Sequence, residues 1–217
     1  ESGATITQNP QEAFQQDLVL KINPPTEEEI EYFKPCTYLV SALQINLRDQ
    51  DYFKKLSEKK INAIAFEFII DEYKQLSLVR LIGEIAGNIS MLYAAELLAL
   101  SNGLMLGGIT GVRPTEVVIL GAGIVGEFAT KAALGLGASV KVFDNSLSKL
   151  RRLHMMVDGR VPTSIIDPKE LSKSLKRADV VIGALSKISL TPIVTEEMVS
   201  KMKKGSVIID VTIDNGK

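Results

Sequence analysis

Three glycines occur where an apolar run meets a helical pattern, in the stretch EVVILGAGIVGEFATKAALGLGASVKVFD of residues 116–144. Gly121, Gly123 and Gly126 have the spacing G-x-G-x-x-G, and they follow the five-residue apolar run EVVIL. Main-chain N–H groups at the start of a helix bind phosphate well, because the positive end of the helix dipole lies there. The stretch therefore predicts a turn that binds a diphosphate.

Each glycine has its own expected task in such a turn. Gly121 permits the tight turn, Gly123 lets the diphosphate approach the main chain, and Gly126 lets the helix pack closely on the strand. Asp144 ends the next apolar run, 18 residues after Gly126. A carboxylate at that place accepts hydrogen bonds from both ribose hydroxyls of adenosine and would repel a 2′-phosphate, which favours NAD over NADP.

The simpler alternative is a glycine-rich turn between a strand and a helix, with Asp144 solvated at a strand end. Glycine spacing alone does not separate the two readings. The preceding apolar strand, the Ala-rich helix and the acid after the next strand together favour a dinucleotide site.

The expected NAD site extends to neighbouring segments. Lys149 lies one helical turn into the next helical segment, where it faces either the ribose or solvent. Ligands of open parallel sheets bind beyond the carboxyl ends of the strands, which adds the segment Ala184-Leu185-Ser186 and, after a later strand, Asp214. The residues predicted to bind NAD are Gly121, Ala122, Gly123, Ile124, Val125, Gly126, Asp144, Lys149, Ala184 and Leu185.

Composition excludes several other classes of site. The net charge of −1 gives no electrostatic case for binding nucleic acid or an anionic membrane. Cys36 is the only cysteine, so no internal disulfide forms. Cys36 and His154 are the only soft metal ligands, too few for a metal site, and His154 is interpreted as a surface or packing residue.

Residues 91–112 are mostly apolar over about the length of a membrane span. Glu96 lies inside this run, and glycines follow at Gly103 and Gly107, so a buried helix followed by a loop is expected instead. No signal peptide is visible, and a cytoplasmic location is predicted.

Short β-like runs alternate with helical patterns along the whole chain, which predicts an α/β fold with parallel sheets. The first series of runs is 4–7, 17–22, 37–43 and 62–70, and Thr26 is expected to cap the helix that follows the second run. The second series is 116–120, 139–144, 162–166, 179–185 and 206–211, with helices expected over 124–136, 146–157, 168–177 and 195–203. Residues 77–101 have the apolar stripe of one long helix, long enough to link two lobes.

The sequence resembles the superfamily of alanine dehydrogenases and transhydrogenase α-subunits along essentially its whole length, and most closely the alanine dehydrogenases. The segments that carry the resemblance are DLVLKINPP, AIAFEF, GEIAGNIS, GGITGVRPTEVVILGAGIVG and IVTEEMVSKMKKGSVIIDVTIDNGK. The resemblance implies two Rossmann-like lobes, with outer pieces of the substrate lobe lying outside this chain. It implies a substrate lobe in residues 1–76, an interdomain helix in 77–103 and an NAD-binding domain in 104–217.

The resemblance also implies a reaction, the oxidation of L-alanine by NAD and water to pyruvate, ammonia and NADH. Lys21 would pair with the substrate carboxylate or carbonyl oxygen, and Asp214 would help to position substrate and assist proton transfer. The simpler alternatives, which are weighed below these roles, are a strand-end lysine at Lys21 and a D-N-G turn at Asp214. A homo-oligomer and a small amino-acid or keto-acid substrate are expected by resemblance.

One position departs from the alanine dehydrogenase pattern. The strand TYLVSAL has Val40 where the family has its catalytic histidine, and valine cannot move a proton. The transhydrogenase α-subunits, which bind NAD(H) and serve a membrane subunit, have a similar strand, LVSF. Their nicotinamide loop is not matched by DEYKQLSLVR, however. Two alternatives therefore stay open, an NAD(H)-binding α-subunit of a proton-translocating transhydrogenase and a catalytically inactive NAD-binding protein.

Overall fold

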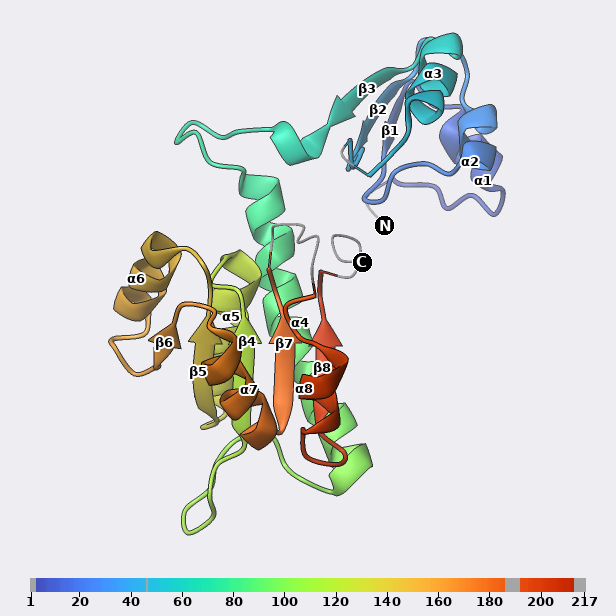
Figure 1. The fold of residues 1–217 in the computed structure, drawn as a ribbon. Helices are drawn as coiled ribbons and strands as arrows, with labels where there is room; N and C mark the ends of the chain where they lie inside the picture. Colours follow the sequence, from blue (N-terminus) through green and yellow to red (C-terminus); the bar gives the residue numbers. More distant parts are fainter. Residues whose placement is uncertain (1–2, 46, 186–191, 213–217) are drawn as a thin grey trace. The chain divides into compact units, whose positions relative to one another are not determined.

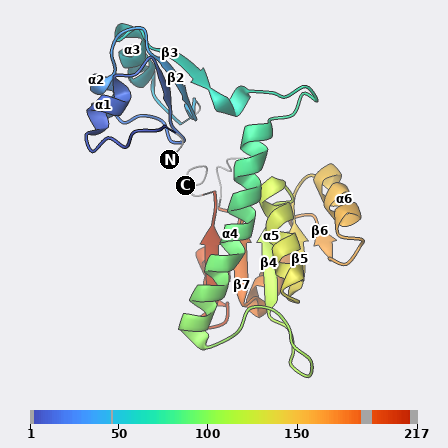
Figure 2. The ribbon, with the colours of Figure 1, turned by 180° about the vertical axis from the view of Figure 1, so that it is seen from behind.

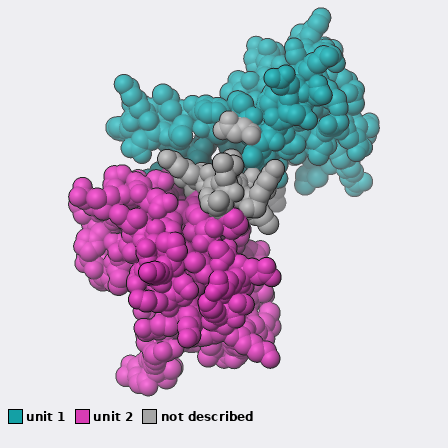
Figure 3. Space-filling model, viewed as in Figure 1, with its two compact units in different colours: residues 1–80 teal, residues 81–217 magenta. Residues whose placement is uncertain are grey.

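The computed structural model describes residues 3–45, 47–185 and 192–212 (Figure 1). The chain forms two compact units, Glu1–Arg80 and Leu81–Lys217, which are coloured separately in Figure 3. Each unit contains its own parallel sheet, so each is described by itself.

Unit 1 contains a three-stranded parallel sheet in the order β1-β2-β3. Its strands are β1 (Leu18–Leu20), β2 (Tyr38–Ser41) and β3 (Asn62–Ala65). Its helices are α1 (Pro10–Phe14), α2 (Glu27–Tyr32), α3 (Gln50–Glu58) and the 3₁₀ helix η1 (Phe66–Phe68). The register places Leu20 opposite Val40, and Val40 opposite Ile64.

Helices α1, α2 and α3 lie on one face of this sheet in both views (Figures 1 and 2). Val19 and Leu39 point to that face and share a core with apolar residues of all three helices. The alternate residues Leu18, Leu20 and Tyr38 are exposed on the other face. This alternation follows from the two-residue period of a strand, which sends successive side chains to opposite faces.

Two strand predictions in unit 1 are wrong. Residues 4–7 form no strand, and Ile6 is 93% exposed, because a β-like run needs a paired neighbour strand to become a strand. The run 62–70 is a strand only as far as Ala65 and then turns into η1. Thr26 does cap α2, as its sequence context predicts.

Unit 2 contains a five-stranded parallel sheet in the order β6-β5-β4-β7-β8. Its strands are β4 (Glu116–Leu120), β5 (Ser139–Phe143), β6 (Thr163–Ser164), β7 (Val180–Gly183) and β8 (Val207–Asp210). The associated helices are α4 (Ser77–Asn102), α5 (Ile124–Gly135), α6 (Leu147–Met156), α7 (Pro168–Arg177) and α8 (Glu196–Ser200). The expected strand 162–166 is reduced to two residues at the sheet edge, and the expected helix 195–203 ends at Ser200.

Helices cover both faces of the larger sheet. Figure 1 shows α7 and α8 in front of the strands, and Figure 2 shows α4 and α5 in front from the opposite side. One core lies under α4, α5 and α6 and contains Ile119, and the other lies under α7 and contains Val118. Burial on both faces explains why the run EVVIL is apolar without alternation.

Helix α4 packs very closely on α5. A Cβ atom added at Gly87 would lie 2.4 Å from the Val125 carbonyl oxygen and 2.8 Å from the Phe128 Cβ. The side of α4 that contains Met91 and Leu98 is fully buried in the core of unit 2. Among the described residues α4 is the single helix long and apolar enough to cross a membrane, a weak indication because core helices pass the same test.

Candidate functional site

The glycine turn joins β4 to α5, at the carboxyl end of the central strand of unit 2. Gly121 has a φ of +117°, and a Cβ atom there would lie 2.3 Å from the Ala184 carbonyl oxygen. A Cβ atom at Gly126 would lie 1.8 Å from the Gly121 carbonyl oxygen. Both positions therefore require glycine, one for its conformation and contact and the other for close packing of helix on strand.

Gly123 differs from the other two glycines. It has an ordinary φ of −75°, and apart from its chain neighbours no atom of the described residues lies within 4 Å of an added Cβ. Among the described residues, the space above Gly123 is therefore open. A side chain at this position would not disturb the fold, but it would occupy the space from which a ligand reaches the turn.

Helix α5 begins without a side-chain cap. Its first intrahelical bond joins the Glu127 N–H to the Gly123 carbonyl at 2.8 Å, so the N–H groups of residues 124–126 have no acceptor in the helix. No other group among the described residues accepts from these N–H groups. Open N–H groups at a helix start are the chemistry of an anion site.

Six other helices of the described residues are capped by side chains. In each of these six a side-chain oxygen accepts from a main-chain N–H of the first turn. The caps are Asn9 on α1, Thr26 on α2, Asp49 on α3, Ser146 on α6, Asp167 on α7 and Thr195 on α8. Helix α5 therefore differs from these six helices, although the short 3₁₀ helix η1 also begins without a side-chain cap.

Asp144 follows β5 and is 5% exposed, so it is not a solvated strand-end acid. Its Oδ2 accepts from the Ala122 N–H at 2.7 Å, and its Oδ1 accepts from the Ser146 N–H at 2.7 Å. Each carboxylate oxygen has a second acceptor position, so these bonds leave room for ribose hydroxyls. The structure thus brings the acid and the glycine turn into direct contact.

The remaining predicted NAD residues lie around the same strand ends. Ala184 is 5% exposed and donates its N–H to the Leu120 carbonyl at 2.7 Å, and Leu185 follows it, half-buried. Lys149 is half-buried in the first turn of α6. Ser186 and Asp214 lie outside the described residues.

Lys21 belongs to unit 1 and follows β1. Its Nζ lies 3.3 Å from the Glu29 Oε2, and both side chains are about a quarter exposed, at 28% and 24%. The same Glu29 oxygen accepts the Thr26 N–H at 2.7 Å, which closes the capping box of α2. Sequence reasoning missed Glu29 as the partner of Lys21, although the Thr-x-x-Glu spacing marks it as a cap.

The segment after Lys21 is fixed by its neighbours in unit 1. The Ala42 N–H donates to the Ile22 carbonyl at 3.1 Å, and the Ser41 hydroxyl donates to the Asn23 carbonyl at 2.9 Å. The Tyr52 hydroxyl donates to the Pro25 carbonyl at 3.0 Å, and burial raises the pKa of Tyr52, which keeps its proton in place. Hydrogen bonds to β2, to the residue after it and to α3 therefore fix the segment that follows Lys21.

Val40 lies on β2 beside the end of β1. The Lys21 N–H donates to the Val40 carbonyl at 3.0 Å, and the Val40 side chain is half-buried. Glu67, on η1, directs its carboxylate to the loop after β2, where it accepts from the Gln44 N–H at 2.7 Å. The carboxyl edge of this sheet thus carries Lys21 but has an apolar side chain at the central position.

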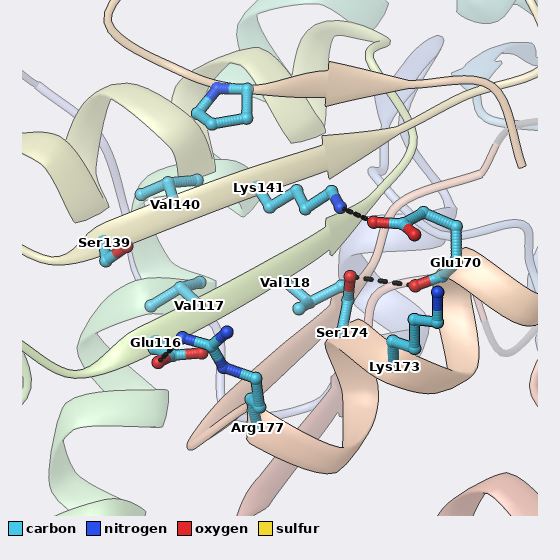
Figure 4. A pocket seen from close by; sticks show the side chains of 11 residues that line it. Glu116, Val117, Val118, Ser139, Val140, Lys141, Glu170, Lys173, Ser174 and Arg177 are labelled. Carbon is cyan, nitrogen blue, oxygen red and sulfur yellow. Dashed lines mark hydrogen bonds and ion pairs between the residues drawn. The ribbon is translucent and has the colours of Figure 1, made fainter.

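A charged pocket of about 310 Å³ lies at the opposite end of the strands of unit 2 (Figure 4). Two ion pairs line it. Glu116 pairs with Arg177 at 3.0 Å, and Lys141 pairs with Glu170 at 2.5 Å. Glu116 is the first residue of β4, whereas the glycine turn follows its last. This pocket is therefore separate from the candidate site, and its main charges neutralise each other.

Metal chemistry has no support among the described residues, which contain no group of three or more His, Cys, Asp or Glu side chains that could hold an ion. His154 is exposed on α6, and its Nε2 would lie 3.3 Å from a Cβ added at Gly159.

Unit 2 combines a parallel sheet, helices on both faces and an uncapped helix start at the central strand, and these features define a Rossmann-like unit. Comparison with known families agrees with this class. The family description "Alanine dehydrogenase/PNT, C-terminal domain" matches residues 90–217, and "Alanine dehydrogenase/PNT, N-terminal domain" matches residues 1–86. The chain belongs to the alanine dehydrogenase/PNT family.

Individual relatives are longer than this chain. An alanine dehydrogenase of Staphylococcus saprophyticus is 36% identical over 100% of this chain, which covers 59% of that protein. A solved L-alanine dehydrogenase superimposes with a TM-score of 0.85 and 31% identity, over 99% of this chain and 61% of its own. A transhydrogenase from Sinorhizobium meliloti has a TM-score of 0.76 at 20% identity over 95% of this chain and 61% of its own, a likeness of fold alone.

Proposed function

We propose that this chain is part of an NAD-dependent amino-acid dehydrogenase of the alanine dehydrogenase type. The proposed reaction converts L-alanine, NAD and water to pyruvate, ammonium, NADH and a proton. The observation that carries the proposal is the uncapped start of α5, where open N–H groups meet the open space above Gly123. The 36% identity to an alanine dehydrogenase supports the choice of substrate class.

The turn between Gly121 and Gly126 fits the diphosphate of NAD, because the N–H groups of residues 124–126 have no acceptor among the described residues and no described side chain lies close above Gly123. Asp144 would accept bonds from the adenosine ribose, and Lys149, Ala184 and Leu185 would line the rest of the nucleotide. NAD, when bound, supplies a hydride acceptor. The chain's task is to hold it and to exclude NADP through the Asp144 charge.

Lys21 is the proposed contact for the substrate carboxylate or carbonyl oxygen. A cation there stabilises negative charge on the carbonyl side of the reacting carbon. Glu29 holds the lysine head from one side at 3.3 Å, which limits the positions that the ammonium group adopts. Asp214 is proposed to assist proton transfer, and it lies outside the described residues.

Val40 sets a specific condition on this proposal. A proton must leave the substrate amino group before hydride transfer, and valine cannot accept it. Another group of the full-length protein must therefore accept the proton if the protein turns over alanine. The test supplies full-length protein with L-alanine and NAD at alkaline pH and follows NADH absorbance. Turnover supports the proposal, and absence of turnover with tight NADH binding overturns it.

The alternative supported by Val40 is an NAD(H)-binding α-subunit of a proton-translocating transhydrogenase, which needs no acid–base histidine for amino-acid oxidation. It differs in its partner, because a membrane subunit would bind NADP. A neighbouring gene with several membrane spans and hydride exchange only after that subunit is added would favour it. Binding of NADH without turnover in either assay would favour the inactive NAD-binding protein.

The domain bounds, oligomeric state and cellular location of the protein stay predictions. We propose a substrate lobe in 1–76, an interdomain helix in 77–103 and an NAD-binding domain in 104–217. A homo-oligomer is proposed from the family alone, and mass photometry of the full-length protein tests it. A cytoplasmic location is tested by cell fractionation.

A further inference from the structure

We infer that Asp144 is a positioning residue for the diphosphate turn, in addition to any contact with ribose. This inference rests on the proposed NAD site and deepens it. The side chain and main chain of Asp144 together link this residue to three segments, two through the carboxylate and one through the N–H group. The carboxylate accepts from Ala122 in the glycine turn and from Ser146 at the start of α6, and the Asp144 N–H donates to the Ser164 carbonyl at 3.2 Å.

The bond to Ala122 is buried. Ala122 is 0% exposed and Asp144 is 5% exposed, so water cannot replace the carboxylate without a change of structure. An unpaired buried N–H is unfavourable, so loss of the carboxylate would drive the turn to rearrange. Ala122 lies between Gly121 and Gly123, so its rearrangement would displace the N–H groups that face the diphosphate.

The neighbouring bonds constrain the same turn from its other side. The Gly121 N–H donates to the Phe143 carbonyl at 2.6 Å, one residue before Asp144. The main chain and side chain at the end of β5 thus hold two consecutive N–H groups of the turn, those of Gly121 and Ala122. Neither is available to a ligand, and both orient the open N–H groups of residues 124–126.

This arrangement has a consequence for cofactor choice. Replacing Asp144 with a small neutral residue removes the charge that repels a 2′-phosphate, but it also removes the acceptor of the Ala122 N–H. The 2′-phosphate of NADPH would then no longer be repelled, but the turn that binds its diphosphate would no longer be held in place. We expect Asp144→Ala to weaken NADH binding without creating tight NADPH binding.

The test compares two ligands with the same ribose. Adenosine has the ribose without phosphate, and ADP adds the diphosphate. If Asp144 only contacts ribose, Asp144→Ala lowers the affinities for adenosine and for ADP by the same factor. If Asp144 also holds the turn, the affinity for ADP falls by at least about tenfold more than the affinity for adenosine, which is the scale of one hydrogen bond to a charged group. Equal losses measured by calorimetry on full-length protein would overturn the inference.

Two further variants keep the test decisive. Asp144→Asn retains one acceptor oxygen and is expected to lose less ADP affinity than Asp144→Ala, which provides a second comparison if the alanine variant does not fold. Asp158→Asn removes the same charge from an exposed loop acid and is expected to leave the affinities for adenosine and ADP unchanged. A loss for Asp158→Asn equal to that for Asp144→Asn would assign the effect to net charge and overturn the inference.

A measurement without ligand separates this inference from the proposed function. Hydrogen exchange of the Ala122 amide is expected to become at least about tenfold faster in Asp144→Asn, because its buried acceptor is weakened. If the wild-type protein binds neither ADP nor NADH, the proposed NAD site fails, and the exchange rate still decides whether Asp144 holds the turn. An unchanged exchange rate overturns the positioning role.

Discussion

Two strand–helix junctions of this chain have opposite chemistry. After β1 in unit 1, the start of α2 is closed by side chains, because Thr26 and Glu29 satisfy each other's main-chain N–H groups. After β4 in unit 2, the start of α5 has no side-chain cap and glycines at its critical positions. A helix start can therefore be stabilised from within the chain or left open for an anion, and the local residues decide which.

The two junctions also use their charged residues differently. At the first, Glu29 is shared between the cap and Lys21, so a cation stands at the strand end. At the second, Asp144 is set back from the helix start and bonds to the turn through Ala122. The first junction thus offers the Lys21 side chain to a ligand, and the second offers the main-chain N–H groups of residues 124–126.

The largest expected effect is at the closest contact of the open junction. Gly126→Ala places a Cβ atom 1.8 Å from the Gly121 carbonyl oxygen. We expect the free energy of unfolding to fall by about 3 kcal/mol, at the upper end of overpacking. NADH affinity should fall about a hundredfold because the turn must move. Denaturant titration and NADH fluorescence measure these two quantities.

Gly135→Ala is the matched control on the same helix. Outside its own helix and chain neighbours, no atom of the described residues lies within 4 Å of its added Cβ, so we expect the free energy of unfolding to stay equal or rise by about 0.5–1 kcal/mol. Equal behaviour of Gly126→Ala and Gly135→Ala would contradict the assigned close contact.

A change at Gly123 should separate binding from folding. Gly123→Ala puts a methyl group into open space at an ordinary φ of −75°, so the free energy of unfolding should change by less than about 0.5 kcal/mol. NADH affinity should still fall, by about tenfold, because the methyl group meets the approaching diphosphate. Unchanged affinity would mean that no ligand occupies the space above this residue.

The closed junction should respond in stability. Glu29→Ala removes the reciprocal cap and the partner of Lys21, and we expect unfolding to become easier by about 1 kcal/mol. Glu29→Gln keeps an acceptor for the Thr26 N–H and should lose less. Equal losses in urea titrations of the two variants would show that the charge near Lys21, and not the cap, matters for stability.

The smallest effect concerns a third helix start. The Asp71 carboxylate accepts from the Ser77 hydroxyl at the start of α4 and from the Gln75 N–H, and these bonds hold the pKa of Asp71 below its ordinary value of 3.8. A carboxyl group whose pKa is lower in the folded chain stabilises the folded state at pH values above its pKa in the unfolded chain. This stabilisation is lost as the pH falls through its pKa in the folded chain.

Asp71→Asn should therefore be slightly less stable than wild type, by a constant difference above about pH 5. The difference should shrink as pH falls below 3.8, where the wild-type carboxyl in the unfolded chain takes up its proton. Denaturant titrations of both proteins across this range measure it. A difference that grows at low pH would contradict the assignment.

Local sequence signals predict much of the fold. The apolar stripe of 77–101 gives α4 to within one residue, since a long periodic stripe tolerates few alternatives. The apolar run EVVIL correctly predicts a strand, and the structure shows that this strand is buried on both faces. The run at 4–7 is misleading, because β propensity carries no information about whether a partner strand is in reach.

The candidate site divides in the same way. Glycine spacing predicts the turn, because backbone conformation and close approach restrict which residue is allowed there. The bond from Ala122 to Asp144 spans 22 residues, and no spacing rule indicates which main-chain group a buried carboxylate accepts from. The pairing of Lys21 with Glu29 depends in the same way on how the loop after β1 is held by β2 and α3.

The sequence by itself determined that a glycine turn starts a helix after a buried strand, because residue type limits main-chain geometry over a few neighbouring positions. It also determined that Val40 brings no proton-transfer group to β2. Only the tertiary structure decided that Asp144 is buried against Ala122 and that the first N–H groups of α5 find no acceptor in the described part of the chain. Those features depend on which strands lie side by side, and pairing of distant strands is a property of the whole sheet.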